Sequence, residues 1–110
     1  MNILVILIVP AICLIAGIAG KLRPARNINS LIGYRSGRSR ASQENWDKAQ
    51  VLMANNLLII GAAELVITLI VYAVTQNLPD DQTSILTIVL VALQTLGVVL
   101  VIPLVESKLS

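Results

Sequence analysis

The side chains that could do chemistry gather in one polar stretch, residues 29–50, which reads NSLIGYRSGRSRASQENWDKAQ. It holds four of the eight basic residues, several serines, one of the two tyrosines and the only tryptophan. Basic side chains beside a membrane helix can set its topology and touch anionic headgroups. The spaced Gly, Tyr and Trp go beyond that role, because a disordered linker does not need them. We therefore expect an ordered surface that a partner could bind.

Residues that usually serve as nucleophiles and metal ligands are scarce. There is no His, and the lone Cys13 lies inside an apolar run, which excludes an internal disulfide, a CxxC redox pair and a Cys/His zinc site. No Gly-rich phosphate loop, GxSxG elbow or HExxH pair occurs. We therefore expect no enzyme, no metal or other cofactor, and no nucleic-acid partner.

Among the polar residues inside the apolar runs, Glu64 and Gln94 have the side chains best suited to chemistry or to a buried hydrogen bond. An ionised carboxylate at the position of Glu64 would be costly in a bilayer, so an acid there is a functional candidate. Glu64 lies ten residues before Val74, and Gln94 lies nine after Ile85, which gives them similar depth in antiparallel helices. The simplest interpretation is a protonated Glu64 hydrogen-bonded to Gln94, worth about 1 kcal/mol.

A sharper alternative makes Glu64 a proton- or cation-binding residue of a small exporter. Small multidrug resistance transporters have a similar length and one membrane carboxylate. They have four spans with the acid in the first and aromatic residues around it. This chain has three apolar blocks, the acid in the second, and no Phe. The exporter is the less favoured function.

Three apolar blocks must position these residues, at 2–20, 51–74 and 85–105. A bilayer-spanning helix needs roughly 20 residues, and backbone polar groups in lipid must be satisfied within the segment. The sequence therefore predicts an all-α integral membrane protein with three transmembrane helices in one domain, residues 1–110. The first block could instead be a signal peptide ending near residues 17–19, but its positive charges follow the block rather than precede it.

The distribution of Lys and Arg predicts the orientation. Residues 21–50 carry seven of the eight basic residues, and the second connection, residues 75–84, carries none. The positive-inside rule then places the 21–50 loop and the C-terminus in the cytoplasm and the N-terminus outside. We expect a multi-pass protein of the bacterial cytoplasmic membrane, with the lipid bilayer as its first partner.

The first block contains a proline with a structural consequence. Pro10 has no N–H, so it should leave the carbonyl of Ile6 without its helical donor. Cys13 and Gly17 are small residues four apart, a spacing that lets a neighbouring helix approach closely.

The polar stretch also predicts where the second helix begins. Ser42 is a good N-cap, and Glu44 suits the positive end of a helix in its first turn. Trp46, Ala49 and Gln50 follow on one helical face. The second helix should therefore extend from Ser42 in the cytoplasm and enter the bilayer near residue 51.

The pattern N-x-x-I-G-Y-R-S-x-x-S-x-x-S-x-E-N-W-x-x-A-Q resembles the signature of the SdpI family of bacterial membrane proteins. The layout of one apolar helix before the motif and two after it is also similar. Ser36 stands where Thr is common, and Gln50 where Asn or His is common. The resemblance singles out the following candidates for partner binding: Asn29, Ile32, Gly33, Tyr34, Arg35, Ser36, Ser39, Ser42, Glu44, Trp46, Ala49 and Gln50.

The resemblance implies a function that composition does not. The family is named for an immunity protein that protects a toxin-producing cell from its own secreted peptide. That founding type is longer and also holds a transcriptional repressor at the membrane. We therefore expect immunity to a membrane-active peptide, by binding the peptide toxin or its target, with docking of a cytoplasmic regulator as a further role. The alternative is an accessory, partner-docking subunit. The oligomeric state stays open.

Overall fold

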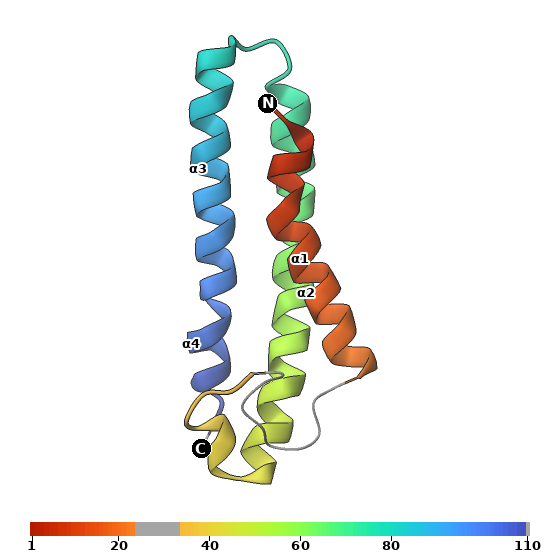
Figure 1. Cartoon of the computed structure of the whole chain (residues 1–110), viewed down its shortest axis with the longest axis vertical. Helices are drawn as coiled ribbons and strands as arrows, with labels where there is room; N and C mark the ends of the chain where they lie inside the picture. The colour runs from red at the N-terminus through yellow and green to blue at the C-terminus, as the bar shows by residue number, and fades with distance from the viewer. Residues whose placement is uncertain (24–33, 110) are drawn as a thin grey trace.

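The computed structural model describes residues 1–23 and 34–109, and within them the fold is helical without strands (Figure 1). The elements are α1 (Ile3–Leu22), a short 3-10 helix η1 (Ser39–Ala41), α2 (Gln43–Val74), α3 (Asp80–Val99) and α4 (Val101–Glu106). Three motif residues, Asn29, Ile32 and Gly33, lie outside the described residues.

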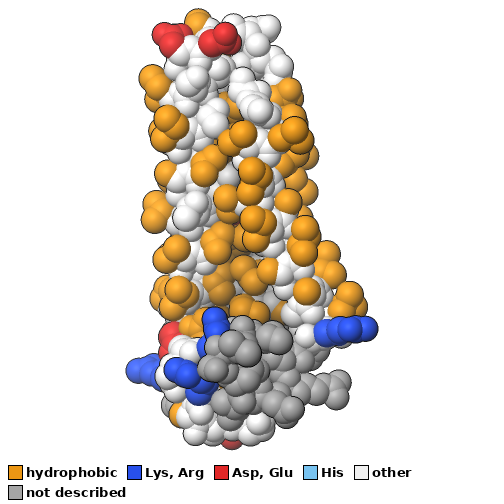
Figure 2. All heavy atoms as spheres, viewed as in Figure 1, with side chains coloured by type: hydrophobic (Ala, Val, Ile, Leu, Met, Phe, Trp, Pro, Cys, Tyr) orange, Lys and Arg blue, Asp and Glu red, His pale blue; other side chains and the backbone are white. Residues whose placement is uncertain are grey.

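In the described residues, three helical segments are long and apolar enough to cross a membrane. They are Ile3–Leu22, Gln43–Val74 and Asp80–Glu106, the last formed by α3 and α4 together. Figure 2 shows hydrophobic side chains over the middle of the visible face, acidic groups at one end, and basic groups together with a few acidic ones at the other. An apolar band between two charged ends is the surface expected of a bilayer-spanning bundle.

The start of α2 confirms the prediction made for Ser42. Its hydroxyl accepts a hydrogen bond from the Asn45 backbone N–H at 3.0 Å, so the serine caps the helix. Trp46 and Ala49 are fully buried on the face that the spacing predicts.

Helices α1 and α2 pack closely through small residues. A Cβ added at Gly61 of α2 would lie 2.9 Å from Cys13 Cβ, and one added at Gly17 of α1 would lie 2.8 Å from Leu58 Cγ. Side chains this close leave no room for a larger residue at either glycine. Small residues therefore allow the two backbones to approach, as they do in membrane helix pairs.

The third apolar block differs from the single helix expected over 85–105. Helix α3 ends at Val99, and α4 begins at Val101 after one intervening residue, Leu100. Pro103 explains the interruption, because it has no N–H to donate to the carbonyl of Val99 four residues earlier. The short α4 packs against α2 through buried Val101 and Val105, which brings the end of the chain beside the polar motif.

Candidate functional site

The described part of the polar motif folds into a compact structure at one end of the bundle, which we call the cap. The cap comprises residues 34–50 together with residues 102–109 (Figure 1). Trp46 and Ser39 lie at its centre with 0% exposure each. Tyr34 is half-buried, while Arg35 and Glu44 are exposed. An indole this deeply buried makes the cap a packed unit.

Gln50 joins the start of the cap to α2 by two hydrogen bonds. Its Nε2 donates to the Tyr34 carbonyl at 2.7 Å, and its Oε1 accepts from the Tyr34 backbone N–H at 2.7 Å. A primary amide supplies one donor and one acceptor side by side, so it pairs with both backbone groups of a single residue. Because Gln50 is only 3% exposed, breaking this pair would leave buried polar groups unsatisfied.

The Tyr34 side chain extends the connection to α4. Its hydroxyl donates to Glu106 Oε1 at 2.6 Å and lies 3.3 Å from the Ile102 carbonyl oxygen. A donor–acceptor distance of about 2.5–2.7 Å is typical of an O–H bonded to an ionised carboxylate. Burial of the phenol, and then its hydrogen bond to Glu106, raise the pKa of Tyr34 to about 12. Tyr34 therefore bridges α2 and α4.

Serine and asparagine side chains hold the turn around η1. The Ser39 hydroxyl donates to the Ser36 carbonyl at 2.8 Å, and the Ser39 N–H donates to the Ser36 hydroxyl at 3.1 Å. Asn45 Nδ2 donates to the Arg38 carbonyl at 3.0 Å, which joins the turn to the first turn of α2. The spaced serines of the motif thus act as local backbone partners.

The cap depends on two residues, Glu106 and Asn45, that are not among the candidates for partner binding. Glu106 accepts a hydrogen bond from the Tyr34 hydroxyl, and Asn45 donates one to the Arg38 carbonyl at the start of the η1 turn. Glu106 could have been noticed as the only acid at the end of the third apolar block. Asn45 is a fixed position of the motif pattern, just before Trp46, but its role depends on the path of the turn, which the pattern does not give.

The expected hydrogen bond between Glu64 and Gln94 is wrong. Gln94 Nε2 instead donates to the Ile6 carbonyl at 2.9 Å and to Thr68 Oγ1 at 2.7 Å. Both Glu64 carboxyl oxygens and Gln94 Oε1 are buried without a hydrogen-bond partner among the described residues. The physical reason is Pro10, which leaves the Ile6 carbonyl in need of a donor that the Gln94 amide supplies.

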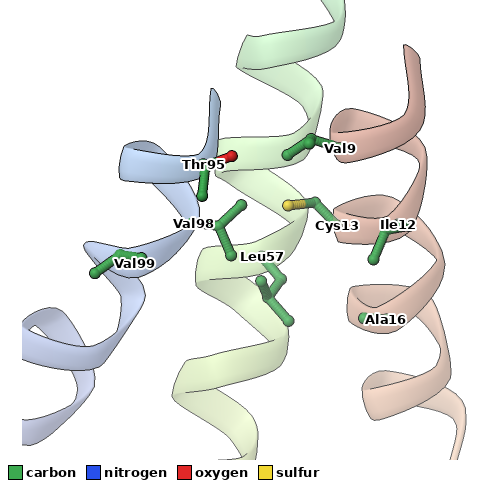
Figure 3. Close-up of a pocket in the computed structure, with 8 residues that line it drawn as sticks. All are labelled: Val9, Ile12, Cys13, Ala16, Leu57, Thr95, Val98 and Val99. Atoms are coloured by element: carbon green, nitrogen blue, oxygen red, sulfur yellow. The ribbon is translucent and has the colours of Figure 1, made fainter. Parts of the chain in front are cut away.

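An apolar crevice of about 420 Å³ lies between α1 and α3, with α2 behind it (Figure 3). It is lined by Val9, Ile12, Cys13, Ala16, Leu57, Thr95, Val98 and Val99. Ile12 and Val99 are each more than half exposed, so the crevice opens on the outer surface of the bundle. Cys13 is a free thiol that packs there as a small apolar side chain.

Comparison with known proteins bears on this arrangement. The family model described as the SdpI/YfhL protein family matches residues 26–105, which include the described motif, α2 and α3. The chain is 42% identical over 48 residues to "Uncharacterized protein YfhL" of Bacillus subtilis (strain 168), and this match covers 44% of each chain. The aligned region therefore spans less than half the length of that relative. No solved structure matches significantly.

Proposed function

The chain belongs to the SdpI/YfhL protein family, and from this membership we propose that it is a multi-pass immunity protein that protects a bacterial cell from a membrane-active peptide. The observation that carries the proposal is the family match, which covers residues 26–105 and so includes the polar motif. In this proposal the protein acts by binding and has no catalytic role.

The orientation belongs to the same proposal. Seven of the eight basic residues lie within residues 21–50, which cover the connection between the first two membrane helices and the adjoining helix ends, so we place the cap in the cytoplasm. The crevice then lies in the cytoplasmic half of the bilayer. A peptide that reaches the protein through lipid would meet the crevice, whose walls come from α1 and α3. Its apolar lining suits the apolar side of a membrane-inserted helix.

A second function is favoured by the cap itself. Arg38 and Arg40 are exposed, and the serine and asparagine hydrogen bonds hold the backbone on which they stand. Fixed cations at the membrane surface suit the docking of an acidic segment of a cytoplasmic regulator. This role could accompany immunity or stand alone as that of an accessory subunit.

A peptide challenge tests the leading function. The gene is deleted, and growth is measured in spent medium from a stationary culture of the parent strain, which holds whatever peptides that strain secretes. We expect growth inhibition in the deletion strain and protection when the wild-type gene is restored. Equal growth of deletion and parent strains in this medium would remove the support for self-immunity.

Matched variants assign protection to a surface. Ala16→Phe fills part of the crevice, while Ala63→Phe adds the same ring at an exposed position of α2 that does not line it. We expect loss of protection only for Ala16→Phe. Arg38→Gln and Arg40→Gln test the docking role, because they remove cap charges and leave the crevice unchanged.

A further inference from the structure

A second cavity, of about 180 Å³, lies between α2 and α3 within the apolar band. We call it the carboxyl pocket, and its lining residues are Glu64, Ile67, Thr68, Leu90, Leu93 and Gln94. The Glu64 carboxyl group rests against α3, since a Cβ added at Gly97 would lie 2.6 Å from Glu64 Oε1. The glycine therefore makes room for the acid.

The carboxyl pocket presents unused hydrogen-bond acceptors. Gln94 is 3% exposed, and both N–H bonds of its amide are occupied by Ile6 and Thr68. Its Oε1 and the two Glu64 oxygens are buried and lack a partner among residues 1–23 and 34–109. Buried polar oxygens are normally satisfied, so three beside one cavity point to a ligand that donates hydrogen bonds.

The number and type of these oxygens select among ligands. A primary ammonium group has three N–H donors, which equals the three available acceptors. A quaternary ammonium has none, and Ca²⁺ requires about 6–8 oxygen ligands. The volume corresponds to about six waters at roughly 30 Å³ each, enough for an ammonium group and the first carbons of its chain.

The lining also indicates the route of entry. Ile67 is 54% exposed and Leu93 is 59% exposed, so the mouth of the carboxyl pocket faces the lipid side of the bundle. A ligand arriving there must partition into the bilayer, which requires an apolar tail on the amine. We propose that the carboxyl pocket binds the primary amino group of a membrane-partitioned amphiphile, as an ammonium–carboxylate pair with Glu64 and Gln94.

The ammonium–carboxylate pair forms by transfer of one proton, and the net charge of the site does not change. The amine enters from lipid as the neutral base, and Glu64 is the neutral acid. The O–H bond of the acid breaks and an N–H bond forms, so the proton passes from Glu64 to the amine nitrogen. The product is an ion pair of zero net charge, which avoids the cost of bringing a lone ion into the membrane. This site is independent of the immunity function that we propose for the chain.

The test uses the full chain in lipid nanodiscs with ¹⁵N-labelled glutamine and ¹³C-labelled glutamate side chains. Octylamine is titrated while NMR follows the Gln94 amide and the Glu64 carboxyl carbon. Octanol and octyltrimethylammonium serve as matched probes without an ammonium N–H. We expect a saturable shift at both groups with octylamine only, and a carboxyl shift that reports ionisation of Glu64.

Variants locate the binding. Glu64→Gln keeps shape and removes the proton that is transferred, so octylamine affinity should fall by about tenfold or more, which corresponds to about 1.4 kcal/mol. Leu93→Trp narrows the mouth and should also weaken binding, while Asp81→Asn at the exposed end of α3 should not. Equal shifts with octyltrimethylammonium, or unchanged octylamine affinity in Glu64→Gln, would overturn the proposal.

A final pair of probes separates two sources of the amine. A membrane-spanning Leu–Ala peptide with one central Lys is compared with the same peptide carrying Gln. Shifts with octylamine and the Lys peptide support a site open to lysine side chains of membrane peptides. Shifts with octylamine alone support a site for small lipophilic amines.

Discussion

The Gln94 side chain donates a hydrogen bond of 2.9 Å to the carbonyl of Ile6, 88 positions away in the sequence. That carbonyl is the one that Pro10 leaves without a helical N–H donor. The bond joins α3 to α1, and the second Gln94 N–H reaches Thr68 of α2. One buried amide therefore ties together all three membrane helices.

This arrangement predicts a coupling between Gln94 and Pro10. Gln94→Leu should lower the free energy of unfolding by about 1–2 kcal/mol, since it leaves the Ile6 carbonyl unsatisfied. Pro10→Ala restores a backbone donor, so the leucine substitution should cost less in that background. Unfolding of the wild type, both single variants and the double variant in mixed micelles measures the coupling. Strictly additive effects would show that the two residues do not share this carbonyl.

Tyr34 and Glu106 predict a titration at high pH. Because the folded pKa of Tyr34 is raised to about 12, above an ordinary value of about 10, its contribution to stability is complete below about pH 10. It is lost as the pH rises toward 12, where the folded phenol also ionises. In a Tyr72→Phe background, absorbance near 295 nm reports Tyr34 alone.

Glu106→Gln provides the control for this titration. It removes the negative charge and retains a side-chain oxygen to accept the hydroxyl, so the midpoint should fall. Burial, the larger cause of the shift, persists, so the midpoint should remain above that of a free tyrosine. An identical Tyr34 midpoint in the wild type and in Glu106→Gln would show that the Tyr34 hydroxyl is not hydrogen-bonded to the Glu106 carboxylate in solution.

The sequence predicted the positions of the helices better than the hydrogen-bond partners of the side chains between them. Apolar blocks and caps determine where helices form, so the three long helices and the Ser42 start could be predicted. Residue counting placed Glu64 and Gln94 at one depth, but depth is only one coordinate of a helical side chain. The Gln94 amide donates instead to the Ile6 carbonyl, which Pro10 leaves without a helical N–H, and to Thr68, so a count of residues along each helix did not predict its partners. The interruption of the third helix at Leu100 could have been predicted from Pro103, which lacks an N–H, but not from hydropathy, which is apolar throughout this block.

The orientation of the bundle can be tested by cysteine labelling. In a Cys13→Ser background, single cysteines replace Ala41 in the cap and Gln82 at the opposite end, both exposed in the structure. Since Ser39 is fully buried, the neighbouring alanine is the better reporter on the cap. We expect a membrane-impermeant maleimide to label position 82 in intact cells and position 41 only after the cells are opened. Labelling of position 41 alone in intact cells would show that the orientation is the opposite of the one proposed.

The pairing of Gln50 with the Tyr34 backbone predicts how the cap depends on one amide. Gln50→Met keeps length and apolar packing but removes the donor and the acceptor, so the Tyr34 N–H and carbonyl lose both bonds. Lys48→Met is the matched control, because it introduces the same methionine side chain at an exposed position of the same helical turn. Hydrogen exchange at the Tyr34 amide should accelerate by about tenfold or more in Gln50→Met, the equivalent of about 1.4 kcal/mol, and remain unchanged in Lys48→Met.

If the cap is the surface through which the protein acts, protection in the peptide challenge should also fall in Gln50→Met. Faster exchange with full protection would assign the function to the membrane helices instead.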